Sequence, residues 1–240
     1  MACRYVKLIL LILITNIATA QNFDLGSWNI LNLKYNFNKK WSVFGETQLR
    51  SLKFYNNFHY YEYKGGLNYK AHKTVALSLG MGSYQTYREG GNFVKPKNNN
   101  EFRIWPQIVL TQSLGKLKVE QRYRAEFRFT SNGYRNRFRY RVGLSYPFGV
   151  EKNSYKPYTI NVSNELFFTS KEPYFERNRL LVSLSYKPSK PITLQAGYLH
   201  QFDYKINDET GRQFLQIGCF IEIFTKNGVK SASDDSLKDN

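Results

Sequence analysis

The chain has 240 residues, with 35 Lys and Arg against 18 Asp and Glu, a formal net charge of +17 and a mean hydropathy of −0.53. After the first twenty residues, no apolar stretch approaches the roughly 20 residues that a membrane-spanning helix needs, which excludes a helical membrane protein. Cys3 and Cys219 are the only cysteines, which excludes a small domain held together by several disulfides.

The first twenty residues have the layout of a secretory signal peptide. Arg4 and Lys7 accompany an apolar run over 6–17, and Ala18-Thr19-Ala20 provides the small residues of a cleavage site. We therefore expect residues 1–20 to be a signal peptide cleaved after Ala20, and the mature chain to be exported. An exported chain rarely meets nucleic acid, so we expect none as a partner despite the positive charge.

Period-two alternation predicts strands along the whole mature chain, because a helix would mix the two residue sets on every face. On the clearest strand, six of the seven residues of one face are apolar: Leu117, Val119, Gln121, Tyr123, Ala125, Phe127 and Phe129. Its other face carries Lys118, Glu120, Arg122, Arg124, Glu126 and Arg128. In chain order, the predicted strands lie near 25–35, 41–50, 60–70, 74–87, 101–114, 117–129, 137–146, 158–168, 177–186, 192–202 and 212–224.

These segments predict an all-β protein, a single antiparallel up-and-down transmembrane β-barrel of about 10–12 strands over 21–225, followed by a polar tail at 226–240. Single-chain bacterial barrels have an even number of strands, so the eleven segments predict one strand missed or one split. Pro106 removes a ladder donor and predicts a bulge. Gly80 and Gly82 are expected to make room for a bulky inward neighbour.

The connections alternate between short turns and longer polar loops, as in outer-membrane barrels. The short turns are predicted at 38–40, 71–73, 115 and 187–190, and the longer loops at 51–58, 88–100, 130–134, 169–174 and 203–211. The alternation requires a short turn at 147–156, but this segment is longer than the other short turns. The 19 Tyr, 18 Phe and 3 Trp are expected to form aromatic girdles at the two membrane interfaces.

A soluble secreted β-barrel or sandwich that binds a ligand is the alternative architecture. Its apolar face would point inward, and the arginine face, for example Arg122 and Arg139, would meet solvent. Several predicted strands have ten or more residues, which favours a tilted membrane crossing.

Short motifs along the mature chain resemble the uncharacterised Gram-negative outer-membrane family catalogued as domain of unknown function 2490. They are Gly26-Ser27-Trp28, Trp41 with 46–50 (Glu-Thr-Gln-Leu-Arg), 120–128 (Glu-Gln-Arg-Tyr-Arg-Ala-Glu-Phe-Arg), 137–141 (Arg-Phe-Arg-Tyr-Arg), 164–167 (Asn-Glu-Leu-Phe) and 176–179 (Glu-Arg-Asn-Arg). The resemblance implies an outer-membrane barrel and implies no activity.

The inward face of a membrane barrel would carry a charged set that we call the lumen set. It consists of Glu46, Arg50, Glu62, Glu101, Arg103, Glu120, Arg122, Arg124, Glu126, Arg128, Arg137, Arg139, Arg141, Glu165, Arg177 and Arg179. Ten arginines face six glutamates, so at least four arginines are expected to lack a carboxylate. The set predicts either a structural brace of crossed Arg–Glu pairs or a narrow, porin-like, anion-preferring channel. The expected partners are outer-membrane lipid, lipopolysaccharide and small anionic solutes.

An outer-membrane lipid-modifying enzyme is a further alternative, and it would need a histidine beside a serine. His59, His72 and His200 are the only histidines, and none has a serine two residues away. No metal-ligand cluster appears either. We therefore expect no enzyme, no cofactor and no metal.

Overall fold

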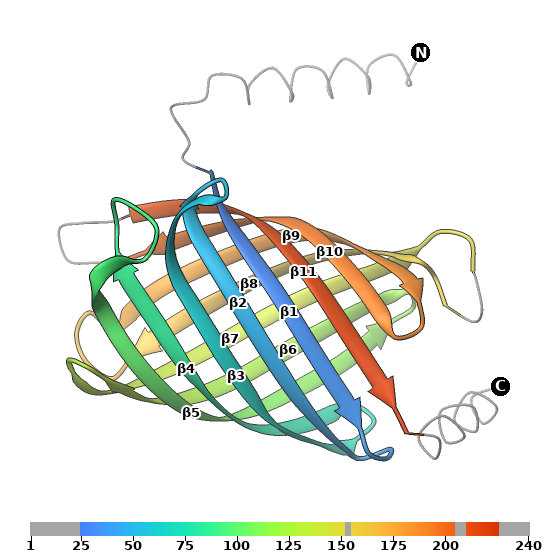
Figure 1. Ribbon diagram of the computed structural model, residues 1–240. Coiled ribbons are helices and arrows are strands. Elements are labelled where there is room, and N and C mark those ends of the chain that lie inside the picture. Colours follow the sequence, from blue (N-terminus) through green and yellow to red (C-terminus); the bar gives the residue numbers. More distant parts are fainter. Residues whose placement is uncertain (1–24, 152–154, 205–209, 226–240) are drawn as a thin grey trace, which may run out of the picture.

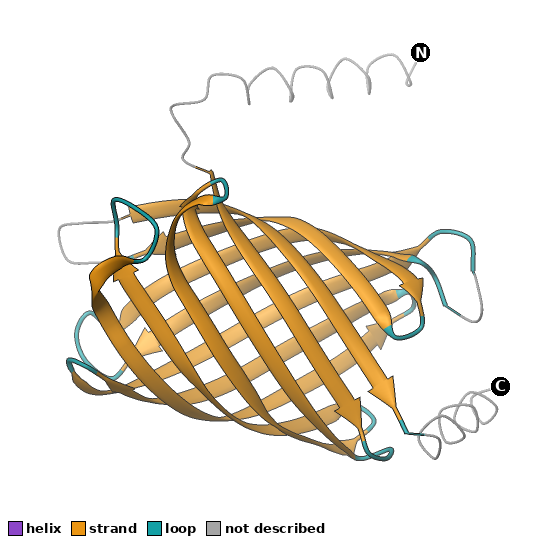
Figure 2. Cartoon of the chain, in the orientation of Figure 1, coloured by secondary structure: helices purple, strands orange, loops and turns teal. Residues whose placement is uncertain are grey.

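The computed structural model describes residues 25–151, 155–204 and 210–225. They form eleven strands that close into one barrel, traced in chain order in Figure 1 and coloured as strand and loop in Figure 2. The strands are β1 (Leu25–Asn36), β2 (Trp41–Lys53), β3 (Asn56–His72), β4 (Val75–Arg88), β5 (Val94–Leu114), β6 (Leu117–Thr130), β7 (Gly133–Phe148), β8 (Tyr158–Thr169), β9 (Phe175–Ser189), β10 (Ile192–Asp203) and β11 (Thr210–Phe224). The predicted signal peptide and the polar tail lie outside the described residues. In the described part of the chain, no helix has the length and apolar character needed to cross a membrane.

The barrel closes through one parallel pair of strands. Each strand pairs antiparallel with the next along the chain, but β1 pairs parallel with β11, from Leu25 opposite Gln213 to Asn36 opposite Phe224. The all-β barrel of about 10–12 strands is confirmed, whereas the expected even number and the fully antiparallel sheet are wrong. In a meander with an odd number of strands, the first and last strands run in the same direction, so they can meet only in parallel.

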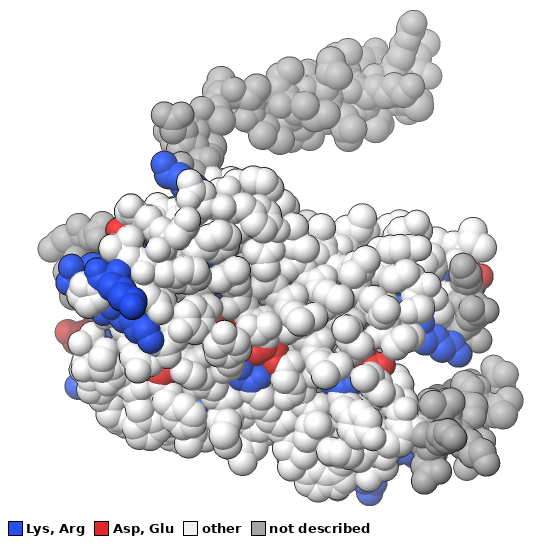
Figure 3. All heavy atoms as spheres, in the orientation of Figure 1, with Lys and Arg blue, Asp and Glu red and all other residues white. Residues whose placement is uncertain are grey.

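Apolar side chains cover the outside of the barrel. On β7, Phe138 is 55% exposed, whereas its neighbour Arg137, on the opposite face of the strand, is 3% exposed. The register carries this alternation across the sheet, because Tyr140 lies opposite Tyr123 and Arg139 lies opposite Arg124. Figure 3 shows an outer wall built mostly of uncharged atoms, with the larger basic clusters near its two ends.

The connections differ from the predicted alternation of short and long. The loops expected at 51–58 and 130–134 are two-residue turns at 54–55 and 131–132, because the flanking strands extend beyond their predicted ends. The longest connection, at 149–157, lies at the end of the barrel where short turns were expected. The sequence had already indicated this exception, since the predicted turn at 147–156 was longer than the rule allows.

Pro106 sits in β5 without the predicted bulge. It lies opposite Leu79 of β4, and the pairing of β5 with β6 has the same register before it, at Ile104–Phe127, and after it, at Gln107–Arg124. Only the pairing with β6 is interrupted at this point. The lost donor is therefore accommodated on one side of the strand, and the register is unchanged.

Gly80 of β4 makes room for Trp105 of β5, as predicted, whereas Gly82 borders Lys64 of β3. A Cβ atom built on Gly80 would lie 2.4 Å from the Trp105 ring, and Trp105 is 1% exposed. The indole packs inside the barrel with Tyr84 and Tyr60, and Phe44 packs against them. Glycine at position 80 thus allows a large ring to fill the interior.

Replacing Gly80 with alanine should destabilise the barrel by about 1–3 kcal/mol, because the added methyl group overlaps a buried ring and forces the sheet to shift. Gly45→Ala is the matched control, since nothing lies within 4 Å of a Cβ at that position. Urea unfolding of the purified protein, followed by tryptophan fluorescence, measures both variants. Equal stability of the two variants would contradict the packing described here.

Candidate functional site

All sixteen residues of the lumen set are buried or half-buried. They occupy β2, β3 and β5 to β9, on the face opposite the exposed apolar rows. Charged side chains in such surroundings have to satisfy one another, because few water molecules can reach them. The site is therefore best described carboxylate by carboxylate.

Glu126 of β6 is the centre of the largest cluster. Its side chain is fully buried, and one carboxylate oxygen lies 2.6 Å from Arg137 while the other lies 2.7 Å from Arg139. Arg124 and Arg103 lie further out, at 3.6 Å and 3.9 Å. Four guanidinium groups from β5, β6 and β7 thus surround one carboxylate, and we call these five residues the Glu126 cluster.

Other carboxylates extend the Glu126 cluster around the inner wall. Glu101 accepts hydrogen bonds from Arg103 at 2.7 Å and from Arg128. Glu165 of β8 pairs with Arg139 at 2.8 Å and with Arg122. Because several arginines contact two carboxylates each, the pairs join into one network that ties β5, β6, β7 and β8 together.

A second cluster lies on β2 and β3. Glu62 accepts from Arg50 at 3.1 Å, from Lys64 at 2.6 Å and from the Tyr60 hydroxyl. Lys64 also pairs with Glu46 at 2.6 Å. Glu62 accepts from three donors and its side chain is 3% exposed, so, like Glu126 in the Glu126 cluster, it is a buried carboxylate shared by several donors.

Aromatic rings fill the space between the charged groups. Phe167 of β8 is fully buried, and Arg139 and Arg179 lie 4.6 Å and 4.7 Å from its ring centre, with Arg137 and Arg177 slightly further away. Planar guanidinium groups stack on aromatic faces and gain a cation–π attraction there. Phe167 is therefore the apolar centre of an arginine shell.

The expected surplus of at least four unpaired arginines is wrong. Nine of the ten arginines in the lumen set have a carboxylate oxygen within 4.0 Å, because single carboxylates are shared. Among the described residues, Arg179 is the exception, and its Nε donates to Gln201 at 2.8 Å.

Three charged partners were missed in the sequence. Lys64 and Asp203 follow the inward parity of Glu62 and Gln201, so alternation could have found them. Glu176 has the opposite parity to Arg177 and Arg179, yet its carboxylate pairs with Arg137 at 2.9 Å and Arg128 at 3.3 Å. A register shift between Phe167 and Phe168, where β8 meets β9, explains this.

The histidines lie apart from the charged network. The His72 ring shares a 2.8 Å hydrogen bond with Thr74 in the β3–β4 turn, and His59 is buried with its Nδ1 atom unpartnered. His200 lies in β10 and is half-buried. In the described ranges, no hydrogen bond joins a histidine to a serine.

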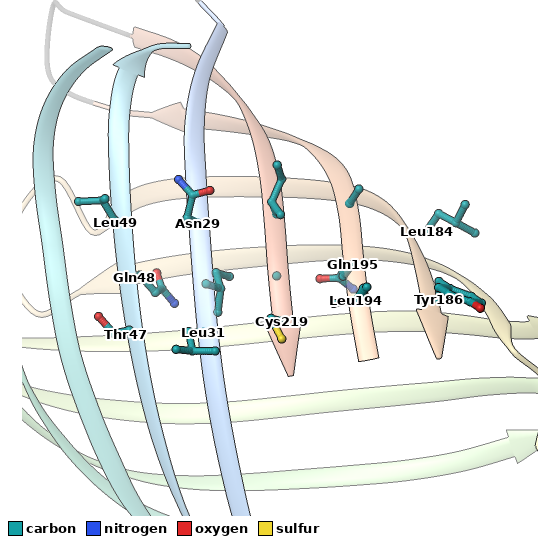
Figure 4. Close-up of a pocket in the computed structure, with 14 residues that line it drawn as sticks. Asn29, Leu31, Thr47, Gln48, Leu49, Leu184, Tyr186, Leu194, Gln195 and Cys219 are labelled. Carbon is teal, nitrogen blue, oxygen red and sulfur yellow. The ribbon is translucent and has the colours of Figure 1, made fainter. Parts of the chain in front are cut away.

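A hollow of about 620 Å³ lies on the outer wall of the barrel and spans the β1–β11 closure. Figure 4 shows Leu31, Leu49, Leu184 and Leu194 around it, with Cys219 between Leu31 and Leu194 and Thr47 on the same strand as Leu49. Five adjacent strands, from β9 through the closure to β2, contribute to its lining. Its walls are largely apolar, in keeping with the rest of the outer face.

Comparison with known proteins gives the family. The family described as "Protein of unknown function (DUF2490)" matches residues 25–212, which run from the start of β1 into β11 and include the whole lumen set. No curated protein and no solved structure matches the chain. The match confirms the resemblance seen in the sequence motifs. The chain therefore belongs to the DUF2490 family of proteins of unknown function.

Proposed function

We propose that the protein is an outer-membrane β-barrel whose lumen is held closed by its arginine, glutamate and aromatic side chains. The observation that carries this proposal is the inverted distribution of polarity. Apolar side chains form the outer wall, whereas the charged residues lie inside. Water-soluble proteins bury the apolar set, and a bilayer-spanning barrel exposes it to lipid.

The dimensions of the barrel suit a membrane. The shortest strands have 12 residues and the longest has 21, whereas a tilted strand needs about 9–11 to cross the hydrocarbon core. Outward side chains such as Leu79, Phe138 and Val182 recur on successive strands. Lipid and lipopolysaccharide are the partners that fit this outer wall, and acyl chains would fill the hollow at the β1–β11 closure.

The soluble alternative needs the reverse arrangement. A secreted barrel or sandwich would bury Phe138 and Leu144 and expose Arg137 and Arg139, but the exposed and buried sets are the other way round. A row of exposed leucine and aromatic side chains around a soluble protein would be an aggregation hazard. The polarity of the two faces therefore favours the membrane.

The packing of the interior supports a closed lumen over a channel. Trp105 and Phe167 are almost fully buried inside the barrel, and Glu126 between them in the sheet order is 1% exposed. An anion-preferring channel needs cations that face open water along its length, whereas nearly every inward arginine here is engaged by a carboxylate. The charged network acts as a brace that joins the strands across the inner wall.

The purified full-length chain should therefore give no discrete conductance steps in planar lipid bilayers, because the filled interior leaves no continuous aqueous path. Co-flotation of the protein with liposomes, and its resistance to extraction with alkaline carbonate, establish insertion independently. The double variant Arg124→Gln, Arg139→Gln should melt at a lower temperature than the wild type, since both residues contact Glu126.

Anion-selective steps from the wild-type protein would contradict the closed lumen. Loss of that selectivity in the double variant, without a change in melting temperature, would assign the arginines to a conducting path. Failure to float with liposomes would contradict the membrane location instead.

A further inference from the structure

Arg179 differs from the other inward arginines in how it is held. Its guanidinium lies 4.7 Å from the Phe167 ring centre and 4.9 Å from that of Trp28, and its Nε donates to Gln201 at 2.8 Å. In the described residues, its two terminal nitrogens have no hydrogen-bond acceptor. The rings and Gln201 fix the position of the group, and its two-pronged end remains available.

A second arginine lies against the same indole. The guanidinium carbon of Arg50 is 3.4 Å from the Trp28 ring centre, and its Nη2 atom donates to Gln48 at 2.7 Å and to Glu62 at 3.1 Å. Arg50 is 9% exposed, and its buried Nε has no partner. Both guanidinium groups thus contact the Trp28 ring, and each has donors for which no described residue provides an acceptor.

The charges around Arg179 are predominantly positive. Arg177, Arg50 and Arg139 all act electrostatically on Arg179, with Glu165 as the nearby anion that opposes them. Glu165 is already shared by Arg122 and Arg139, Asp203 is held by Arg177, and Glu62 is shared with Lys64. No described carboxylate is left to neutralise Arg179, so an incoming anion would relieve repulsion between the arginines.

The pair lies close to one mouth of the barrel. Trp28 is near the start of β1, Arg50 near the end of β2, Arg179 near the start of β9, and Gln201 near the end of β10. Because these strands alternate in direction, all four positions fall within about four residues, or ~13 Å, of the same rim. The pair therefore lies nearer to this rim than to the opposite one, at about the same depth as Glu126, which is four residues from the end of β6.

We propose that Arg50 and Arg179, stacked on Trp28, form a binding site for the oxyanion of a small carboxylate or phosphate compound. Guanidinium groups donate two parallel hydrogen bonds to such groups, and the aromatic rings keep the donors oriented. Arg179 supplies the free two-pronged end, Arg50 supplies a second positive charge, and Gln201 orients Arg179. This inference depends on the barrel fold and on neither the membrane location nor the closed lumen.

The test uses the full chain folded in uncharged detergent micelles, with inorganic phosphate and acetate as separate probes at constant ionic strength set by sodium chloride. Tryptophan fluorescence is the readout, because the arginines contact Trp28 directly. We expect a saturable change with at least one probe, and the stronger probe identifies the oxyanion class. Arg179→Gln should weaken binding by about tenfold or more, since charged hydrogen bonds contribute roughly 1.5–3 kcal/mol.

Arg141→Gln is the matched control, because Arg141 is also inward but pairs with Glu120 and contacts neither ring. It should bind as the wild type does, and Arg179→Lys, which keeps the charge and loses the second prong, should bind between wild type and Arg179→Gln. Circular dichroism verifies that each variant is folded. Absence of a saturable response to both probes, or equal binding by wild type and folded Arg179→Gln or Arg179→Lys, would overturn the proposal.

Discussion

Replacing Glu126 with glutamine should destabilise the barrel by about 3–5 kcal/mol, which is the usual cost of removing one partner from a buried ionic network. The substitution keeps the shape of the side chain and removes the negative charge that four arginines share. Arg137 and Arg139 would then repel each other in surroundings that water reaches poorly. Urea unfolding in detergent micelles measures the loss.

Glu120→Gln is the control for this prediction. Among the described residues, Glu120 pairs only with Arg141, and both side chains are about one-third exposed, so its removal should cost about 1 kcal/mol or less. Adding Arg137→Gln to Glu126→Gln should restore part of the lost stability, because it removes one of the four positive charges that Glu126 no longer balances. If Glu126→Gln were no more destabilising than Glu120→Gln, the Glu126 cluster would not be the brace described here.

Arginine in place of Val142 should cost about 2–4 kcal/mol in a lipid environment, which is the range for a cation near the middle of the bilayer on the outer face of a barrel. Val142 lies near the midpoint of β7, in the outward row with Phe138 and Leu144. Equilibrium unfolding after refolding into liposomes is the appropriate measurement, because detergent imposes no fixed membrane depth.

Two neighbouring substitutions calibrate the Val142 result. Val142→Leu keeps the outer face apolar and should change stability little. Gly143→Ser is on the inward face, where a new Cβ would meet Ser163 at an ordinary 3.7 Å, so its effect should also be small. If Val142→Arg left the stability unchanged while Gly143→Ser lowered it strongly, the two faces of β7 would be reversed.

Alternation predicted most of the fold because two faces of one sheet meet such different surroundings. The row of residues that begins at Leu117 is mostly apolar and the row that begins at Lys118 is charged. The sequence of this one segment therefore predicted both that it is a strand and which residues share each face. The same argument predicted the room that Gly80 leaves for Trp105. These predictions depend on single strands and their neighbours, for which period-two patterns carry enough information.

Features that depend on how strands meet could not be predicted in this way. Glu176 reaches Arg137 only because the β8–β9 register shifts at Phe167, and parity alone assigns it to the outer face. The expected interface girdles do not account for Trp28, Trp105 and Phe167, which stack with arginines inside the barrel. The parallel closure of β1 with β11 likewise follows from the strand count of the whole chain, against the expected even number.

Cell fractionation tests the central claim most directly, because a barrel that exposes apolar residues and buries charged ones should be stable only in a membrane. The mature chain should fractionate with the outer membrane, resist extraction with alkaline carbonate, and migrate faster on gels when unheated than when boiled, as a closed barrel without free edges remains compact. Recovery of the folded chain from the soluble periplasmic fraction, with the same mobility before and after boiling, would contradict the account.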